Sequence, residues 1–171
     1  MRSPAGCAAV LVFVVLLPSC TCVSRDATGD PAALGGFERD VLYELRQPVR
    51  LFFRKEPETA NLPRYVMVPP IGASADERQP RDLETYTQGA VEIATIPGGT
   101  RLRVSSVRLY ACPDFKETVL YGRLVEGPYK DKLASLNPLS TPITDHVSDV
   151  TARNPDPRYI RLVNSPGEST R

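Results

Sequence analysis

The feature that most constrains the fold is a series of short segments in which apolar and polar residues alternate, interrupted by prolines. In the segment 41–54, six of the seven odd positions are apolar, whereas only two of the seven even positions are. A period of two is typical of a strand that buries one face. The 17 prolines are roughly twice the usual share, and each fixes φ and removes an amide donor. The pattern therefore predicts short strands joined by many loops.

The alternation continues through Pro48 without a change of parity. This predicts one bent strand or two collinear strands, with Pro48 at a sheet edge or a bulge, where its missing N–H is tolerated. The alternative is a helix over 37–46, because Phe37, Val41 and Leu45 have helical spacing.

The clearest strand pattern covers residues 90–136. The turn Pro97–Thr100, with the sequence PGGT, places proline and glycine where a tight turn needs them. The inward parity then switches at Ser105–Ser106, which predicts a β-bulge, and Gly122 is where another backbone could approach closely. The expected strands are 64–68, 90–96, 101–110, 118–125, 132–136 and 158–163, and the expected loops are 71–89 and 137–157, each with at most a helical turn.

These elements predict an all-β fold: a small, partly open barrel or sandwich of about 6–8 short antiparallel strands. The order strand, PGGT, strand, loop, strand, GPYK, strand resembles SH3-like barrels over about 50 residues. We expect one β-rich domain over 37–164 and a frayed tail at 165–171.

The N-terminus has the features of an export signal. Arg2 precedes ten uncharged, mostly apolar residues, Ala8–Leu17, which suit a signal-peptide core and are too short to span a bilayer as a helix. The alternative is a buried helix or strand of the folded domain. The following LPSC, Leu17–Cys20, resembles the lipobox of bacterial lipoproteins.

The resemblance implies that residues 1–19 are a signal peptide and that Cys20 is acylated and becomes the first residue of the mature chain. The resemblance also implies three acyl chains, and because two already make a stable anchor, three would hold the protein at a membrane essentially permanently. Thr21 rather than aspartate follows Cys20, which in this family implies the outer membrane, with the domain facing the periplasm. The alternative is ordinary signal-peptide cleavage near Thr21 or Cys22.

The segment 20–36 is polar, small and rich in glycine, and we expect it to be a flexible tether. Removal of residues 1–19 takes away Arg2 and no acidic residue, so the formal charge of +1 falls to zero. A neutral chain has no electrostatic footprint for nucleic acid, and no nucleic-acid partner is expected.

Cysteine and histidine are too few for most metal and nucleophile chemistry. Cys7 would leave with the signal peptide, and Cys22 and Cys112 could form a disulfide in the oxidising periplasm. Otherwise Cys112 is a partly buried thiol and Cys22 has no role. One histidine and one C-x-C cannot supply the four ligands of a structural zinc site, so neither a metal nor a cofactor is expected.

Catalytic constellations are equally sparse. Cys112 and His146 are the only Cys–His couple, and no nucleophile motif surrounds Cys112. Asp82 and Glu84 are paired carboxylates in a charged segment that is typical of a solvated loop. We therefore expect a protein that is not an enzyme, with a small hydrolase that uses carboxylates or Cys112 as the alternative.

The most suggestive surface feature is basic. Residues 101–132 contain seven basic and four acidic side chains with tyrosines between them, and arginine and tyrosine are enriched at binding surfaces. The alternative is an ordinary solvated sheet face. The candidate binding residues are Arg101, Arg103, Arg108, Tyr121, Arg123 and Tyr129.

Together these features favour a membrane-anchored envelope lipoprotein whose non-catalytic β-domain binds a periplasmic or envelope partner, either a protein or peptidoglycan. The alternative of a different class is a periplasmic inhibitor or immunity protein that acts against a toxin or a lytic enzyme.

Overall fold

The computed structural model describes residues 23–55, 63–70, 80–111, 116–143 and 152–163. The chain is mostly β, which confirms the predicted all-β class. The strands are β1 (Val23–Asp26), β2 (Leu42–Leu45), β3 (Val49–Phe53), β4 (Tyr65–Val68), β5 (Val91–Ile96), β6 (Arg101–Ala111), β7 (Lys116–Leu124), β8 (Leu133–Ser135), β9 (Ser140–Pro142), β10 (Arg153–Pro155) and β11 (Ile160–Leu162). The helices are α1 (Pro31–Leu34), α2 (Pro80–Thr87) and the 3₁₀ turn η1 (Asn137–Leu139).

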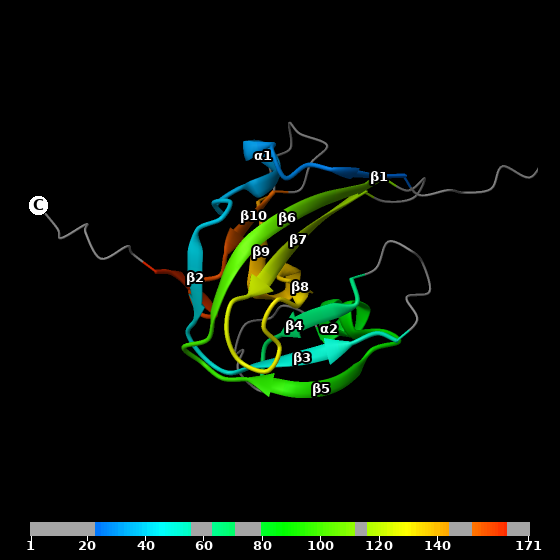
Figure 1. Cartoon of the computed structure of the whole chain (residues 1–171). Coiled ribbons are helices and arrows are strands. Elements are labelled where there is room, and N and C mark those ends of the chain that lie inside the picture. The colour runs from blue at the N-terminus through cyan, green and yellow to red at the C-terminus, as the bar shows by residue number, and fades with distance from the viewer. Residues whose placement is uncertain (1–22, 56–62, 71–79, 112–115, 144–151, 164–171) are drawn as a thin grey trace, which may run out of the picture.

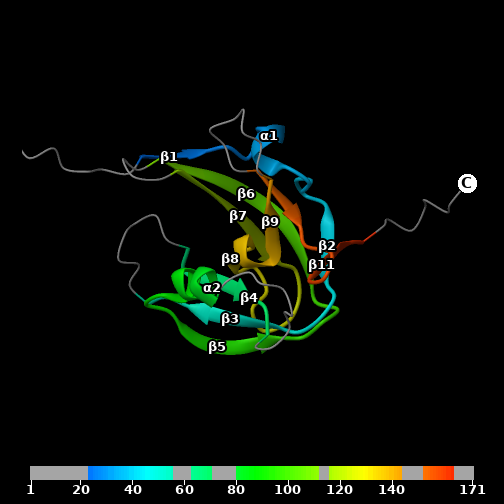
Figure 2. The same cartoon turned by 180° about the vertical axis from the view of Figure 1, so that it is seen from behind.

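Nine strands form one strongly curved sheet (Figures 1 and 2). Its order is β11-β2-β6-β7-β8-β4-β3-β5, with β1 beside β6, and β9 and β10 form a separate pair. The described part therefore has more strands than the 6–8 expected. The sheet is also open and mixed, because β4 and β8 pair in parallel. A parallel pair requires a long connection, and here that connection contains α2 and three strands.

The alternation in 41–54 determines which face of β2 and β3 is buried. Tyr43, Leu45, Val49 and Leu51 all lie in the main core, as the odd parity predicted. Pro48 lies in the short turn between the two strands, where no ladder hydrogen bond is required of it. The alternative of a helix over 37–46 is wrong, because β2 occupies much of that segment.

The predicted bulge is confirmed on β6. The pairing of β6 with β7 shifts by one residue between Val104 and Ser106, and Val104 and Val107 are both fully buried on the core side. The expectation for Gly122 differs in one respect: a Cβ there would lie 2.8 Å from the Leu136 side chain, so a side chain rather than a backbone approaches it.

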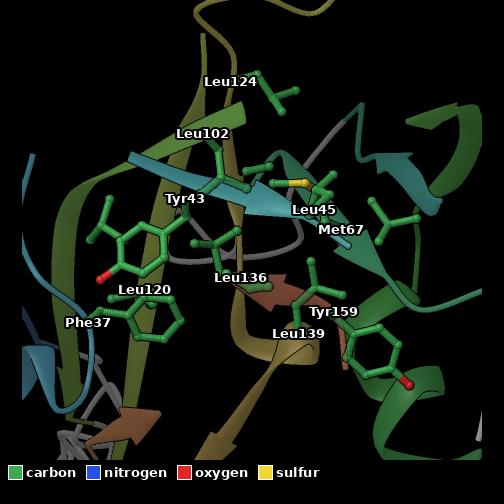
Figure 3. Packing of buried hydrophobic residues seen from close by; sticks show 14 of the residues in the cluster. Phe37, Tyr43, Leu45, Met67, Leu102, Leu120, Leu124, Leu136, Leu139 and Tyr159 are labelled. Atoms are coloured by element: carbon green, nitrogen blue, oxygen red, sulfur yellow. The ribbon is translucent and has the colours of Figure 1, made fainter. Parts of the chain in front are cut away.

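Several segments expected to be unstructured contribute to the core. Figure 3 shows Leu139, which comes from a segment predicted to be a loop, packed with core residues of the large sheet. Leu136 and Tyr159, which lie in the expected strands 132–136 and 158–163, pack there as well. The range 20–36 also differs from a flexible tether, since it contains β1 and α1. Asp30 caps α1 by accepting a hydrogen bond from the Ala32 amide at 3.0 Å.

Helix α2 has two turns where a long loop with at most one was expected. It packs against the sheet face opposite the main core, where Tyr86 and Ala90 contact a small cluster of Phe52, Val66 and Val68. The end of α2 is held by Arg54, which is 1% exposed. Its guanidinium donates to the carbonyls of Pro63 at 2.8 Å, Tyr86 at 3.1 Å and Gln88 at 2.9 Å. Neither this helix nor any other in the described ranges is long and apolar enough to cross a membrane.

Candidate functional site

Five of the six predicted binding residues lie on one face of the long ribbon formed by β6 and β7. Arg123 is directly opposite Arg103, and Tyr121 is directly opposite Ser106. Because alternate residues of a strand share a face, Arg101 and Arg108 join them on the side opposite the main core. We call this surface the basic face, and its residues are Arg101, Arg103, Arg108, Tyr121 and Arg123.

The centre of the basic face is the Arg103–Arg123 pair. Both side chains are exposed, and neither forms an ion pair with another residue that the structure describes. Like charges directly opposite one another across a ladder destabilise a sheet. The same row continues to Leu42 on β2 and to Leu133 on β8, which is 38% exposed. Two guanidinium groups and an exposed aliphatic side chain therefore lie side by side.

The neighbouring charges on this side of the sheet have partners. Arg101 Nε lies 3.8 Å from Glu126 Oε1, and the same oxygen accepts a hydrogen bond from the Arg101 amide at 2.8 Å. On β2, Glu44 accepts from Arg161 at 2.7 Å. Arg103 and Arg123 thus bring two charges without an ion-pair partner among the described residues directly opposite one another.

The part of the β6–β7 ribbon between the bulge and Ala111 is less accessible. The hydroxyls of Tyr121 and Tyr110 lie 3.3 Å apart, and burial raises the pKa of Tyr121 far above its ordinary value, so this phenol stays protonated. Arg108 is exposed and stands opposite Asp26 of β1. Both residues lie on the predicted face, but Tyr121 contributes a half-buried edge rather than an open contact.

Tyr129 does not belong to the basic face. It lies in the turn after β7, packs against the main core, and places its hydroxyl 3.5 Å from the Ile93 carbonyl of β5. Tyr129 thus lies apart from the arginines, and its role at a binding surface stays a prediction.

A second polar group was missed from the sequence, and we call it the Arg153 cluster (Tyr86, Glu117, Asn137, Ser140 and Arg153). The Arg153 guanidinium donates to the Asn137 carbonyl at 3.1 Å, to Ser140 Oγ at 3.3 Å and to the Tyr86 hydroxyl at 3.0 Å. Asn137 Nδ2 in turn donates to Glu117 Oε1 at 3.2 Å. Asn137 thereby connects the Glu117 carboxyl to the Arg153 guanidinium.

Two opposing effects act on the pKa of Glu117 in the Arg153 cluster. Burial raises the pKa of Glu117, and the nearby charge of Arg153 offsets only part of that rise. Burial likewise raises the pKa of Tyr86. The members come from α2, β7, η1, β9 and β10, so no local motif could have indicated them. Because their hydrogen bonds join those elements, the cluster acts primarily as a structural connection.

Replacing Glu117 with glutamine is expected to stabilise the protein at pH 8. Burial raises the pKa of Glu117 in the folded protein, so the charged carboxylate opposes folding and the protonated carboxyl favours it. Its stabilising effect is present below the unfolded pKa, near 4.5, and is lost as the pH rises through the higher folded value. Urea unfolding at pH 4 and pH 8 should show a gain for Glu117→Gln that appears only at pH 8. The exposed Glu38→Gln control should stay within about 0.5 kcal/mol of wild type at both pH values, and a Glu117→Gln variant that is less stable at pH 8 would contradict this reading.

The remaining candidates lie outside the described residues, namely Cys20, Cys22, Cys112 and His146. The predicted lipidation, the predicted disulfide and the Cys–His alternative therefore stay predictions. Within the described ranges, no group of three or more His, Cys, Asp or Glu residues is placed to hold a metal ion. Comparison with protein-family models, curated proteins and solved structures finds no match for this chain.

Proposed function

We propose that this chain is a lipoprotein of the bacterial envelope, acylated on Cys20, whose β-domain binds an envelope partner and catalyses no reaction. The anchor rests on the LPSC lipobox resemblance. The binding role rests mainly on one observation, the directly opposed and exposed Arg103–Arg123 pair. We place the partner, a protein or peptidoglycan, on the basic face.

The chemistry of the pair selects a carboxylate-bearing partner. Like charges directly opposite one another destabilise a sheet, and an arriving carboxylate would relieve that repulsion. Guanidinium groups bind carboxylates through two parallel hydrogen bonds. Leu133 beside them is partly exposed and supplies apolar area, and the buried core of an interface is more apolar than its rim.

The double variant Arg103→Gln/Arg123→Gln is expected to bind the partner at least about tenfold more weakly, which corresponds to about 1.4 kcal/mol. Its stability should equal or slightly exceed that of wild type, because the repulsion between the two side chains is removed. The measurement is affinity purification from envelope extracts, followed by titration of the purified partner. The matched control is Arg39→Gln/Arg64→Gln, which removes two exposed arginines outside the basic face. Equal affinity of the two double variants would contradict the proposed surface.

The Cys20→Ala variant is expected to move from the membrane fraction to the soluble fraction. The thiol of Cys20 is the acylation site that the lipobox resemblance implies, and without the acyl chains the mature chain has no other proposed anchor. Fractionation by ultracentrifugation measures the shift, with Cys22→Ala as the control that should remain membrane-bound. A Cys20→Ala protein that still sediments with membranes would overturn the anchor.

A further inference from the structure

The chain between the proposed anchor and the folded domain is very short. Strand β1 begins at Val23 and pairs with β6, with Val23 opposite Ala111 and Asp26 opposite Arg108. The docking continues beyond the strand: the Ala27 amide donates to the Val107 carbonyl at 2.9 Å, and the Val107 amide donates to Thr28 Oγ1 at 3.1 Å. The segment 23–28 is thus fixed along β6.

Only three peptide units separate Cys20 from Val23. Consecutive Cα atoms are 3.8 Å apart, so the Cα of Val23 lies at most about 11 Å from that of Cys20. Because Val23 stands opposite Ala111, and Ala111 pairs with Lys116, all three residues must lie close to the lipid that carries the chain.

We propose that, in the anchored protein, the end of the sheet formed by Val23, Ala111 and Lys116 rests on the phospholipid headgroups of the anchoring membrane. This inference depends on the proposed acylation of Cys20. The short connection between Cys20 and Val23 would then hold the domain at the membrane in a defined orientation, whereas a flexible tether would let it move freely.

The surface chemistry of this end suits a headgroup layer. Val23 is apolar and 65% exposed, and it belongs to neither hydrophobic cluster of the described residues. Arg25 and Lys116 are exposed close by. Apolar side chains flanked by long cationic ones are typical of membrane-interface contacts, since the cations can reach lipid phosphates.

The same geometry determines how far the Arg103–Arg123 pair lies from the end of the sheet that we place on the membrane. Arg103 is eight residues along β6 from Ala111, which corresponds to about 26 Å at roughly 3.3 Å per residue. In Figure 1 the β1 end of the ribbon lies far from the corner where β2 meets β3. The Arg103–Arg123 pair is therefore presented to soluble or envelope partners, away from the lipid surface that carries the anchor.

The test uses acylated protein in phosphatidylcholine vesicles that contain a lipid with a nitroxide quencher on its headgroup. Fluorophores are attached to Ser24→Cys, near the anchor, or to Lys130→Cys, in the turn after β7, each with Cys22→Ser and Cys112→Ser. We expect quenching at Ser24→Cys to be at least about threefold stronger than at Lys130→Cys. Insertion of twelve Gly/Ser residues between positions 22 and 23 allows an average reach of about 19 Å and should bring the two values together.

Two measurements distinguish a failure of the proposed anchor from a failure of the proposed headgroup contact. Vesicle sedimentation is measured first, and a wild-type chain that stays in the supernatant would overturn the anchor proposed above. A chain that sediments but shows equal quenching at both positions would overturn the headgroup contact while leaving the anchor in place.

Discussion

Replacing Arg54 with alanine is expected to lower the free energy of unfolding by about 3–5 kcal/mol. The guanidinium is almost completely buried and donates to carbonyls of Pro63, Tyr86 and Gln88. Without it, three partly buried carbonyls lose a donor. Each unsatisfied buried acceptor costs roughly 1–3 kcal/mol.

Urea unfolding followed by circular dichroism measures the Arg54→Ala loss. The matched control is Arg64→Ala, an exposed arginine just before β4, which should change stability by less than about 0.5 kcal/mol. Arg54→Lys should recover only part of the loss, because one ammonium group cannot match the planar fork that reaches three carbonyls. A loss below 1 kcal/mol for Arg54→Ala would show that water or a rearrangement satisfies those carbonyls.

Replacing Gly35 with alanine is expected to cost about 2–4 kcal/mol, through backbone strain and a clash together. Gly35 has φ +62, where a Cβ is strongly disfavoured. A Cβ there would also lie 2.5 Å from the Arg153 carbonyl oxygen and 2.8 Å from its backbone nitrogen. Because these atoms belong to the backbone of β10, relief requires movement of α1 or β10.

Two glycines allow the strain and the clash to be separated for Gly35→Ala. Gly127 has φ +80 but no atom within 4 Å of a built Cβ, so Gly127→Ala reports strain alone. Gly29 has neither the positive φ nor a close neighbour, so Gly29→Ala should be nearly neutral. The expected order of urea midpoints is Gly29→Ala above Gly127→Ala above Gly35→Ala. Equal midpoints for the last two would show that the contact with β10 carries no energy.

Sequence patterns predicted the parts of the fold whose strands bury one face. The odd parity of β2 and β3 and the bulge in β6 were visible because each strand carries its own alternation. Strand β1 was not, since all four of its residues are exposed and it exists only through pairing with β6. Leu139 was equally hidden, because a single apolar residue between a proline and polar residues has no period to detect.

The candidate site depended on register as well as on residue type. The basic composition of 101–132 was visible, but the opposition of Arg103 and Arg123 was not. If the pairing of Ser106 with Tyr121 continued without interruption, Arg103 would stand opposite Leu124. The extra residue Ser105 shifts the register by one and places Arg103 opposite Arg123. Predicting the pair would have required both the length of the β6–β7 turn and the exact size of the bulge.

The order of strands also constrains when the domain can form. Strand β11 lies at the end of the described chain yet pairs with β2, and Arg161 and Glu44, which join them, are 117 residues apart. Contacts of such separation form late, since a long loop must close first. The β6–β7 hairpin can form early from neighbouring residues, whereas β2 gains its outer partner only when the last strand arrives. In a chain that crosses a membrane from its N-terminus, β2 would thus stay without its outer partner until nearly all of the chain has passed through.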